Sequence, residues 1–373
     1  MTPSVTSSPR RPAAAVNSGN SIPSLDGIRA IAFLIVFVSH AGLESTVPGG
    51  FGVTVFFFLS GYLITTLLRI EREKHGRIHL RDFYLRRVLR ILPPFYTVLA
   101  IGAILATTGV ISGALRWGPM AAVACHFGNF WMIRHGESGL PEGTGVYWSL
   151  AVEEHFYLLF PWIFEGLHRL PLSRKARAGV LLGFCALILA WRVVLVRGGA
   201  SANRTNWGSD TRFDSILFGC ALAIGSNPAL DRSPIPDKIW RRVLLPIGLL
   251  GLTWAFIDRD PAFRETWRYT LQGISLVPIF VVGICQPSWG PMKFLNWGPI
   301  KFVGVLSYST YLLHCLVLAA FTRHTPLTGP WPGLLGLAGT LALGWLIHIT
   351  IERPAANLRR RLSHGSVPAA PAA

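Results

Sequence analysis

Eleven apolar segments, joined by shorter polar connections, account for most of this 373-residue chain. A run of about 20 apolar residues crosses a bilayer as an α-helix, because a helix satisfies its backbone polar groups without water. Hydrophobic residues make up 51% of the chain and charged residues only 14%, which excludes an ordinary water-soluble domain. We therefore predict an all-α fold, a polytopic transmembrane helix bundle, with segments near 27–44, 50–69, 92–112, 118–133, 146–165, 178–196, 212–227, 242–257, 267–285, 302–321 and 332–350.

The basic residues indicate which connections face the cytosol. The net charge is +17, and arginine and lysine gather near 69–90, 169–177 and 228–242 and in the C-terminal tail. Asp231 and Asp237 dilute the charge of the third connection, but Arg241 and Arg242 still favour the cytosol. Because these bases are spread over loops instead of one surface, we expect no nucleic-acid partner.

Eleven crossings cannot place all four basic stretches on the same side of a membrane. The segment 118–133 is short and contains His126 and Asn129, so we predict that it is re-entrant or interfacial. This leaves about ten spans, with both termini cytosolic, in a multi-pass protein of the cell inner (plasma) membrane.

Both ends of the chain are poor in apolar residues. Residues 1–22 predict a disordered cytosolic tail, and 356–373 predict a basic, disordered C-terminal tail. The membrane domain then covers 23–355, and we expect no soluble domain at either end. The five cysteines are odd in number and lack a CxxC spacing, so they predict neither a disulfide framework nor a metal site.

Arg29 and His40 are the only strongly polar residues in the apolar run that begins at Ile28. Eleven helical steps return to within about 20° of the starting direction and rise about 16 Å, so both side chains share one face. Ionisable side chains at such depth usually face a protein-lined cavity. A snorkelling arginine and a histidine bonded to a neighbouring helix are the structural alternative.

A second polar face contains Ser149, Glu153 and Tyr157, which repeat every four residues. Glu153 is predicted to be a buried carboxylate that raises the basicity of a histidine or binds a sugar hydroxyl; pairing with an arginine is the structural alternative.

Three further motifs leave function and packing both open. Ser307, Tyr311 and His314 form a polar stripe that suits helix packing as well as substrate binding. Arg212 and Asp214 open a span, where they either grip an acceptor or cap the helix. His348 and Glu352 stand four residues apart, as a clamp or a catalytic pair, before Arg353 and Pro354, which is expected to stop the helix.

In their order along the chain, these runs resemble the acyltransferase 3 family of multi-spanning membrane acyltransferases. The resemblance extends from Ser24 to about Pro354. Its most specific parts are Leu25-Asp26-Gly27-Ile28-Arg29-Ala30 leading to His40, Phe56-Phe57-Phe58-Leu59-Ser60-Gly61-Tyr62-Leu63-Ile64, Arg86-Arg87-Val88-Leu89-Arg90-Ile91-Leu92-Pro93, Trp148-Ser149-Leu150 with Glu153-Glu154, Phe213-Asp214, Ser307-Tyr308 with Tyr311 and His314, and Glu352-Arg353-Pro354.

The resemblance implies transfer of an acyl group, usually acetyl, from cytosolic acyl-CoA to a hydroxyl of an envelope glycan or its lipid-linked precursor. The family's arginine-to-histidine motif carries over onto Arg29 and His40. One departure is Thr54, where members commonly have an acidic residue, so no role of that carboxylate transfers. Some members also carry a soluble C-terminal hydrolase-like domain, which we do not expect in this chain.

The chemistry of the residues agrees with that expectation. Histidine is the usual base for a hydroxyl that attacks a thioester, which suits His40, with Glu153 as a second catalytic candidate. A transient acyl-histidine is an alternative to direct transfer. Arginines bind the phosphates of CoA, and the candidates are Arg29, Arg86, Arg87 and Arg90. The candidate substrate-binding residues are Ser149, Tyr157, Asp214, Tyr311 and His314.

No permanently bound cofactor is expected, because acyl-CoA acts as a donor substrate; the other partners are the glycan acceptor and membrane lipid. A transporter or flippase for a glycolipid or anion is the alternative from another class. A polyprenyl-linked glycosyltransferase is a third, although it would need more acidic residues in its cytosolic loops to hold a metal-bound nucleotide sugar.

Overall fold

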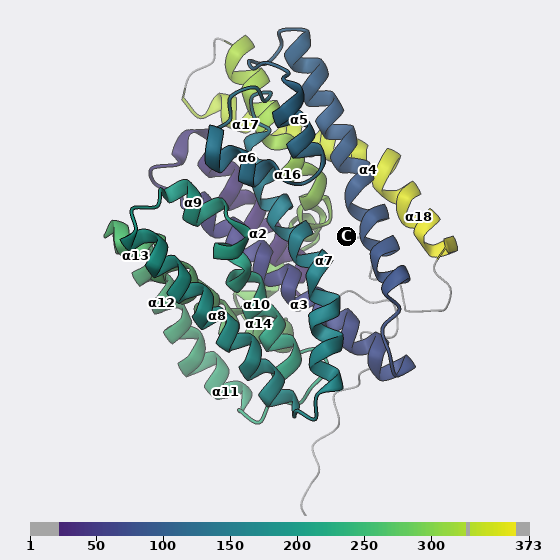
Figure 1. The fold of residues 1–373 in the computed structure, drawn as a ribbon, viewed down its shortest axis with the longest axis vertical. Helices are drawn as coiled ribbons and strands as arrows, with labels where there is room; N and C mark the ends of the chain where they lie inside the picture. The colour runs from purple at the N-terminus through teal and green to yellow at the C-terminus, as the bar shows by residue number, and fades with distance from the viewer. Residues whose placement is uncertain (1–21, 326–328, 363–373) are drawn as a thin grey trace, which may run out of the picture.

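The computed structural model describes residues 22–325 and 329–362, which form helices and connecting segments without a named strand (Figure 1). The predicted all-α class is confirmed. The predicted tail 1–22 and the end of the predicted C-terminal tail fall almost wholly outside the described residues. The helices are α2 (Leu25–Val38), η1 (Ser39–Leu43), α3 (Gly49–His75), α4 (Leu80–Thr107), α5 (Trp117–Ala124), α6 (Gly128–His135), η2 (Gly145–Tyr147), α7 (Trp148–Arg169), α8 (Arg174–Arg197), α9 (Ala202–Trp207), α10 (Ser209–Gly225), α11 (Asp237–Ile239), η3 (Trp240–Leu244), α12 (Leu245–Ile257), α13 (Pro261–Glu265), α14 (Trp267–Cys285), α15 (Met292–Leu295), α16 (Gly298–His324), α17 (Trp331–Ile347), η4 (His348–Glu352) and α18 (Arg353–Leu362).

Within the described ranges, eight helical stretches are long and apolar enough to cross a membrane. The predicted spans near 146–165 and 212–227, which correspond to α7 and α10, are not among them. Helix α10 has only 17 residues, most of them buried. Helix α7 contains the polar residues Glu153, Glu154 and His155. A multi-spanning helical bundle is therefore established, and the count of ten spans is not.

The segment 118–133 is divided into two short helices, α5 and α6, of eight residues each. His126 lies between them with a φ of 59°, a left-handed conformation that interrupts the helix. Eight residues rise only about 12 Å, which is too short to cross about 30 Å of hydrocarbon. The break agrees with the expectation that this segment does not cross as one helix.

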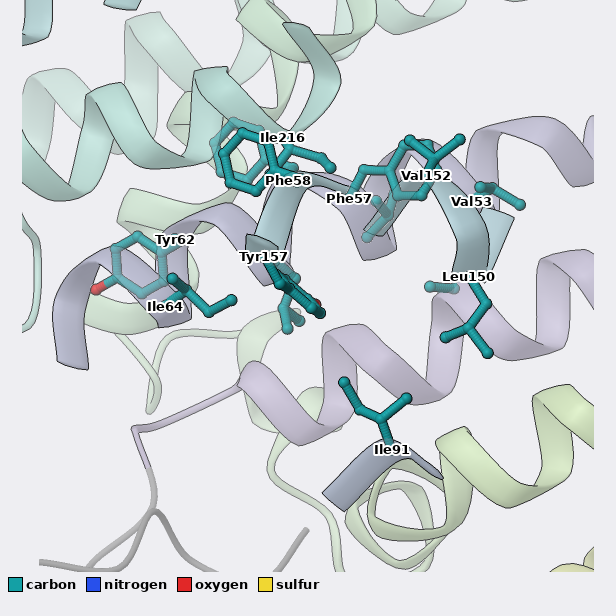
Figure 2. Packing of buried hydrophobic residues seen from close by; sticks show 14 of the residues in the cluster. Val53, Phe57, Phe58, Tyr62, Ile64, Ile91, Leu150, Val152, Tyr157 and Ile216 are labelled. Carbon is teal, nitrogen blue, oxygen red and sulfur yellow. The ribbon is translucent and has the colours of Figure 1, made fainter. Parts of the chain in front are cut away.

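Helices α3 and α10 cross with their backbones in contact at the centre of the bundle. A methyl group added at Gly61 would lie 2.0 Å from the carbonyl oxygen of Ile216, and one added at Gly219 would lie 2.0 Å from that of Phe58. Small residues permit such close crossings in membrane bundles. Buried side chains from α3, α7 and α10 pack around the crossing, including Tyr62 (Figure 2).

The C-terminal end departs from the prediction, because Pro354 does not stop the helix. The helical backbone is continuous from Trp331 to Leu362, and Pro354 lies just after the widened turn η4, which ends at Glu352. Helix α18 lies beside α4 (Figure 1). Residues 356–362 are therefore helical, and the predicted disorder from residue 356 is wrong for that stretch.

Candidate functional site

A cavity of about 140 Å³ lies between α2, α3, α4, α7, α16, η4 and α18. Most of the predicted site residues meet here, although they come from distant parts of the chain. The polar side chains that line it are Arg29, Ser60, Arg87, Arg90, Ser149, Glu153, Tyr157, Ser307, Tyr308, Tyr311, His348, Glu352, Arg353 and Arg359.

Positive charge dominates this cavity. Among the described residues its lining has five arginines, three of them predicted from the sequence, against two glutamates. Arg29 keeps one ion-pair contact, with Asp26 one turn earlier at 3.6 Å. Guanidinium groups suit phosphate recognition, because each fork presents two parallel N–H donors.

Sequence reasoning missed the contribution of α18 to this cavity. Arg353, Ala356 and Arg359 stand three residues apart and line it from one face of the helix. The spacing is readable in the sequence, but the expectation of disorder after residue 355 concealed it. Ser60 of α3 and Tyr308 of α16 were also not predicted.

Arg86, a predicted phosphate ligand, does not line the cavity. Its Nη2 lies 2.6 Å from Oε2 of Glu71, a carboxylate with a side chain only 2% exposed. The other oxygen of Glu71 accepts a hydrogen bond from the backbone of His79 at 2.8 Å. Arg86 therefore joins α3 to α4 in this structure.

Glu153 faces the cavity and receives two hydroxyl groups. Ser60 donates to its Oε1 at 2.8 Å, and Tyr157 donates to its Oε2 at 3.2 Å. The guanidinium of Arg87 stacks 5.4 Å from the centre of the Tyr157 ring. The described contacts of Glu153 include no histidine, so the structure places it with the arginines and apart from His40.

Ser149 and Tyr311 line the cavity from two facing helices. Their hydroxyl oxygens lie 2.7 Å apart, between α7 and α16. Ser149 also donates to the carbonyl oxygen of Val146 at 3.1 Å. This pair joins two of the polar stripes that the sequence showed separately.

His40 and His314 form a pair just beyond Tyr311. The Nδ1 atom of His40 lies 3.0 Å from Nε2 of His314, and Nδ1 of His314 lies 2.6 Å from the carbonyl oxygen of Tyr311. A carbonyl only accepts, so His314 holds its proton on Nδ1, and its Nε2 accepts the proton that His40 carries on Nδ1. The Nε2 atom of His40 is then left with a free lone pair.

The two histidines differ in exposure, and neither lines the arginine-rich cavity. His314 is completely buried between Phe33 and Phe37, whereas His40 is exposed in the widened turn η1. Within this turn, Ala41 and Gly42 depart from helical backbone angles, and Gly42 has a φ of 99°. Such widened turns often mark functional sites in helices.

Asp214 was predicted to bind substrate, and the structure contradicts that prediction. Its side chain is completely buried inside α10 and lies 2.7 Å from Nη2 of Arg192 on α8. It caps no helix and lines none of the described cavities. The pair is a structural link between two helices, since an unpaired charge there would be very costly.

Arg212 is a buried cation whose described hydrogen bonds involve neutral groups. Its Nη2 donates to Thr54 at 3.0 Å and its Nη1 to Asn206 Oδ1 at 2.7 Å. Its guanidinium stacks on the ring of Tyr269 at 4.1 Å. Thr54 thus contacts the cation through a hydroxyl, at the position where the sequence departs from the family pattern.

His348 and Glu352 form the clamp that their spacing suggested. Nδ1 of His348 lies 2.8 Å from Oε2 of Glu352, and Ser309 donates to Oε1. Both residues line the cavity, so the clamp also contributes to the site.

Cys315 adds a third group of metal-ligand type beside the histidine pair. Its Sγ and one nitrogen of each histidine lie within 4.8 Å of one another. The histidines already bond directly to each other, which accounts for their geometry without an ion. Within the described ranges none of the five cysteines forms a disulfide.

The site and the bundle define the class, a membrane-embedded enzyme with a basic cavity and a histidine pair. The chain belongs to the acyltransferase 3 family: the model of its acyltransferase domain matches residues 22–349. This membership favours bond-making chemistry over the transporter, flippase and glycosyltransferase alternatives. No solved structure is significantly similar to the chain.

Curated relatives support the assignment. The chain is 30% identical to the peptidoglycan O-acetyltransferase OatA of Listeria monocytogenes serovar 1/2a over 89% of its own length and 55% of that protein. It is 31% identical to a putative peptidoglycan O-acetyltransferase of Bacillus subtilis (strain 168), over 89% of this chain and 54% of the relative. A putative O-acetyltransferase of Staphylococcus aureus (strain COL) is 30% identical over 80% of this chain and 51% of the relative. The chain therefore spans about half the length of these relatives.

Proposed function

We propose that the protein transfers an acyl group, acetyl in the simplest case, from cytosolic acyl-CoA to a hydroxyl of a cell-envelope glycan. One observation carries the proposal. Tyr311 lines the arginine-rich cavity, and its ring lies 5.5 Å from the ring of His314, which forms a hydrogen-bonded pair with His40. Charged groups for the donor and a general base thus lie close together in one bundle.

The donor's phosphates bind to the arginines of α4 and α18. Arg90, Arg353 and Arg359 line the part of the cavity beside α18, and Arg29 lies deeper on α2. Arg29 and His40 are separated by about 16 Å along the helix, a distance that an extended pantetheine arm covers. The cytosolic position of this end follows from the basic connections and belongs to the proposal, as do the inner-membrane location and the cytosolic termini.

His40 acts as the general base. Its Nε2 takes the proton of the acceptor hydroxyl while the hydroxyl oxygen attacks the thioester carbon. The carbon–sulfur bond then breaks, and the CoA thiolate leaves and takes up the proton. His314 keeps Nε2 of His40 unprotonated by accepting the proton on Nδ1.

Glu153 serves the donor side of the reaction. Its carboxylate offsets part of the arginine charge and holds Tyr157 beneath Arg87. In this proposal it positions the cavity wall, and His40 performs the proton transfer.

The experiment uses the purified full chain in lipid nanodiscs with radiolabelled acetyl-CoA and N-acetylglucosamine oligomers. We expect acetyl transfer by the wild type and a loss of about 10²–10⁴-fold in His40→Ala, with an unchanged melting temperature. His75→Ala, which alters an exposed histidine at the end of α3, is the control. Full activity of a folded His40→Ala protein would exclude the base, and binding without any acyl transfer to glycan or water would exclude the function.

A further inference from the structure

A second cavity, of about 320 Å³, lies at the end of the bundle that carries His40. Its walls are residues 44–51, the end of α12, the connection that contains α13, and the start of α14. Ser39 and Glu44 both line it, and they bracket His40 in the chain. We call it the outer cavity.

Arginines are concentrated at the outer cavity and have few acidic partners. Arg259, Arg264 and Arg268 line it, together with the carboxylates of Glu44 and Asp258. Among residues 22–325 and 329–362, no ion pair involves Arg259 or Arg264. The Nη2 of Arg268 reaches Glu265 only at 4.0 Å.

One N–H donor at this cavity is buried without an acceptor. The Nε of Arg268 is inaccessible and makes no hydrogen bond in the described part of the chain. A buried donor that lacks a partner costs about 1–3 kcal/mol. An anionic ligand in the cavity would bring acceptors to this arginine.

Arg212 adds positive charge behind the wall. It contacts the cavity-lining residues Asn206 and Tyr269, and its own Nε also lacks an acceptor. The hydrogen bonds of Arg212 within the described residues go to neutral groups of Asn206 and Thr54. A cation fixed in a buried site projects its potential into a neighbouring cavity more strongly than an exposed one does.

The remaining lining suits a hydroxylated ligand. Phe51 and Phe256 meet edge to face at 5.0 Å, and Gln272 and Asn206 add amide groups. Apolar and aromatic walls with a few fixed polar groups are typical of small-molecule sites.

We propose that the outer cavity binds the acyl acceptor, and that this acceptor is an acidic carbohydrate, one that bears a carboxylate or a phosphate. The first half rests on the proposed function, because it makes the hydroxyl of the bound sugar the substrate of His40. The preference for an acidic carbohydrate rests on the arginines alone. Equilibrium binding measures this preference without any acyl transfer.

The test compares sugars that differ in one acidic group. Saturation-transfer NMR on the full chain in phosphatidylcholine nanodiscs gives dissociation constants for N-acetylglucosamine, N-acetylmuramic acid, which adds a carboxylate, and N-acetylglucosamine 6-phosphate. We expect an acidic sugar to bind at least about tenfold more tightly, as one charge-assisted contact implies. Arg264→Gln and Arg268→Gln should remove most of the preference, and the exposed Arg197→Gln should keep it.

A substitution at Thr54 tests the buried charge separately. Thr54→Asp places a carboxylate against Arg212 and should lower the preference for acidic sugars several-fold, whereas Thr54→Asn should retain it. Melting temperatures show whether each variant is folded. If Thr54→Asp is unfolded, the comparison of Arg264→Gln with the wild type decides, because Arg264 is only half-buried.

Equal binding of acidic and neutral sugars would overturn the inference. So would an acidic preference that Arg264→Gln and Arg268→Gln leave intact, or loss of sugar binding when phosphatidylglycerol replaces phosphatidylcholine, which would assign the arginines to lipid headgroups. If acidic sugars bind as expected but acyl transfer fails, the proposed function fails while the site stands.

Discussion

The Nδ1 atom of His40 and the Nε2 atom of His314 lie 3.0 Å apart, although 274 residues separate the two histidines in the chain. The carbonyl oxygen of Tyr311 fixes the proton of His314, and the pair then fixes the proton of His40. One backbone oxygen therefore determines which nitrogen of the exposed histidine is free to act as a base.

His314→Leu should lower kcat by about 10–100-fold and leave the donor KM unchanged, because it removes the acceptor that orients His40 and touches no donor phosphate. His314→Gln retains an acceptor oxygen and should recover part of the loss. Steady-state kinetics in nanodiscs measure both values. A rise in donor KM without a fall in kcat would contradict a positioning role.

Arg359→Ala should raise the KM for acetyl-CoA about tenfold, since one charge-assisted contact to a phosphate is lost. Arg361→Ala, on the exposed side of the same helix, is the matched control and should leave KM unchanged. The use of acetylpantetheine, which lacks the nucleotide phosphates, should abolish the difference between Arg359→Ala and wild type. An equal effect of both substitutions would mean that α18 acts through general charge.

Asp231 lies in the connection after α10 and binds arginines of two helices, α3 and α8, at the end of the bundle that we assign to the cytosol. Arg69 donates to both of its oxygens, at 2.8 and 3.0 Å, and Arg174 donates at 2.7 Å. Burial alone would raise the pKa of this carboxyl, but the hydrogen bonds from Arg69 and the backbone of Asn227 hold the pKa below its usual value.

The stability that Asp231 contributes is present above the pKa of the unfolded state, about 3.9, and is lost as the pH falls through the lower folded pKa. Asp231→Asn should cost about 2 kcal/mol at pH 7, and the difference from wild type should shrink as the pH falls below about 4. Melting temperatures in detergent between pH 3 and 7 measure it. A difference that stays constant across this range would refute the ionic origin.

Gly61→Ala should destabilise the bundle by about 3 kcal/mol, because its methyl group would lie 2.0 Å from a backbone oxygen of α10 and neither helix can shift freely. Gly179→Ala on α8 is the control, since no atom lies within 4 Å of the added methyl group. Thermal unfolding followed by size-exclusion chromatography compares them. Equal stability of the two variants would show that the crossing of α3 and α10 is looser than described.

Hydropathy and charge made the helical bundle and a cavity lined by arginines predictable, and His40 as the base stays a prediction. A run of apolar residues has one low-energy backbone conformation in lipid, so sequence alone determined where most helices lie. Polar residues inside such runs must face protein, and Arg29, Arg87, Arg90, Glu153 and Tyr157 do line one cavity. The same reasoning failed for Arg86 and Asp214, since a buried charge can equally be satisfied by one structural partner.

Other features depended on contacts between distant segments. The sequence determined that His40 and His314 each stand on an apolar helix, but only the packing of α2 against α16 decided that they bond to each other. The sequence showed arginines after residue 352. Only the tertiary structure, in which α18 packs against α4, showed that Arg353 and Arg359 line the cavity. Helix formation depends on neighbours a few residues away, whereas a site depends on which helix faces meet, and that is determined by side-chain packing over the whole bundle.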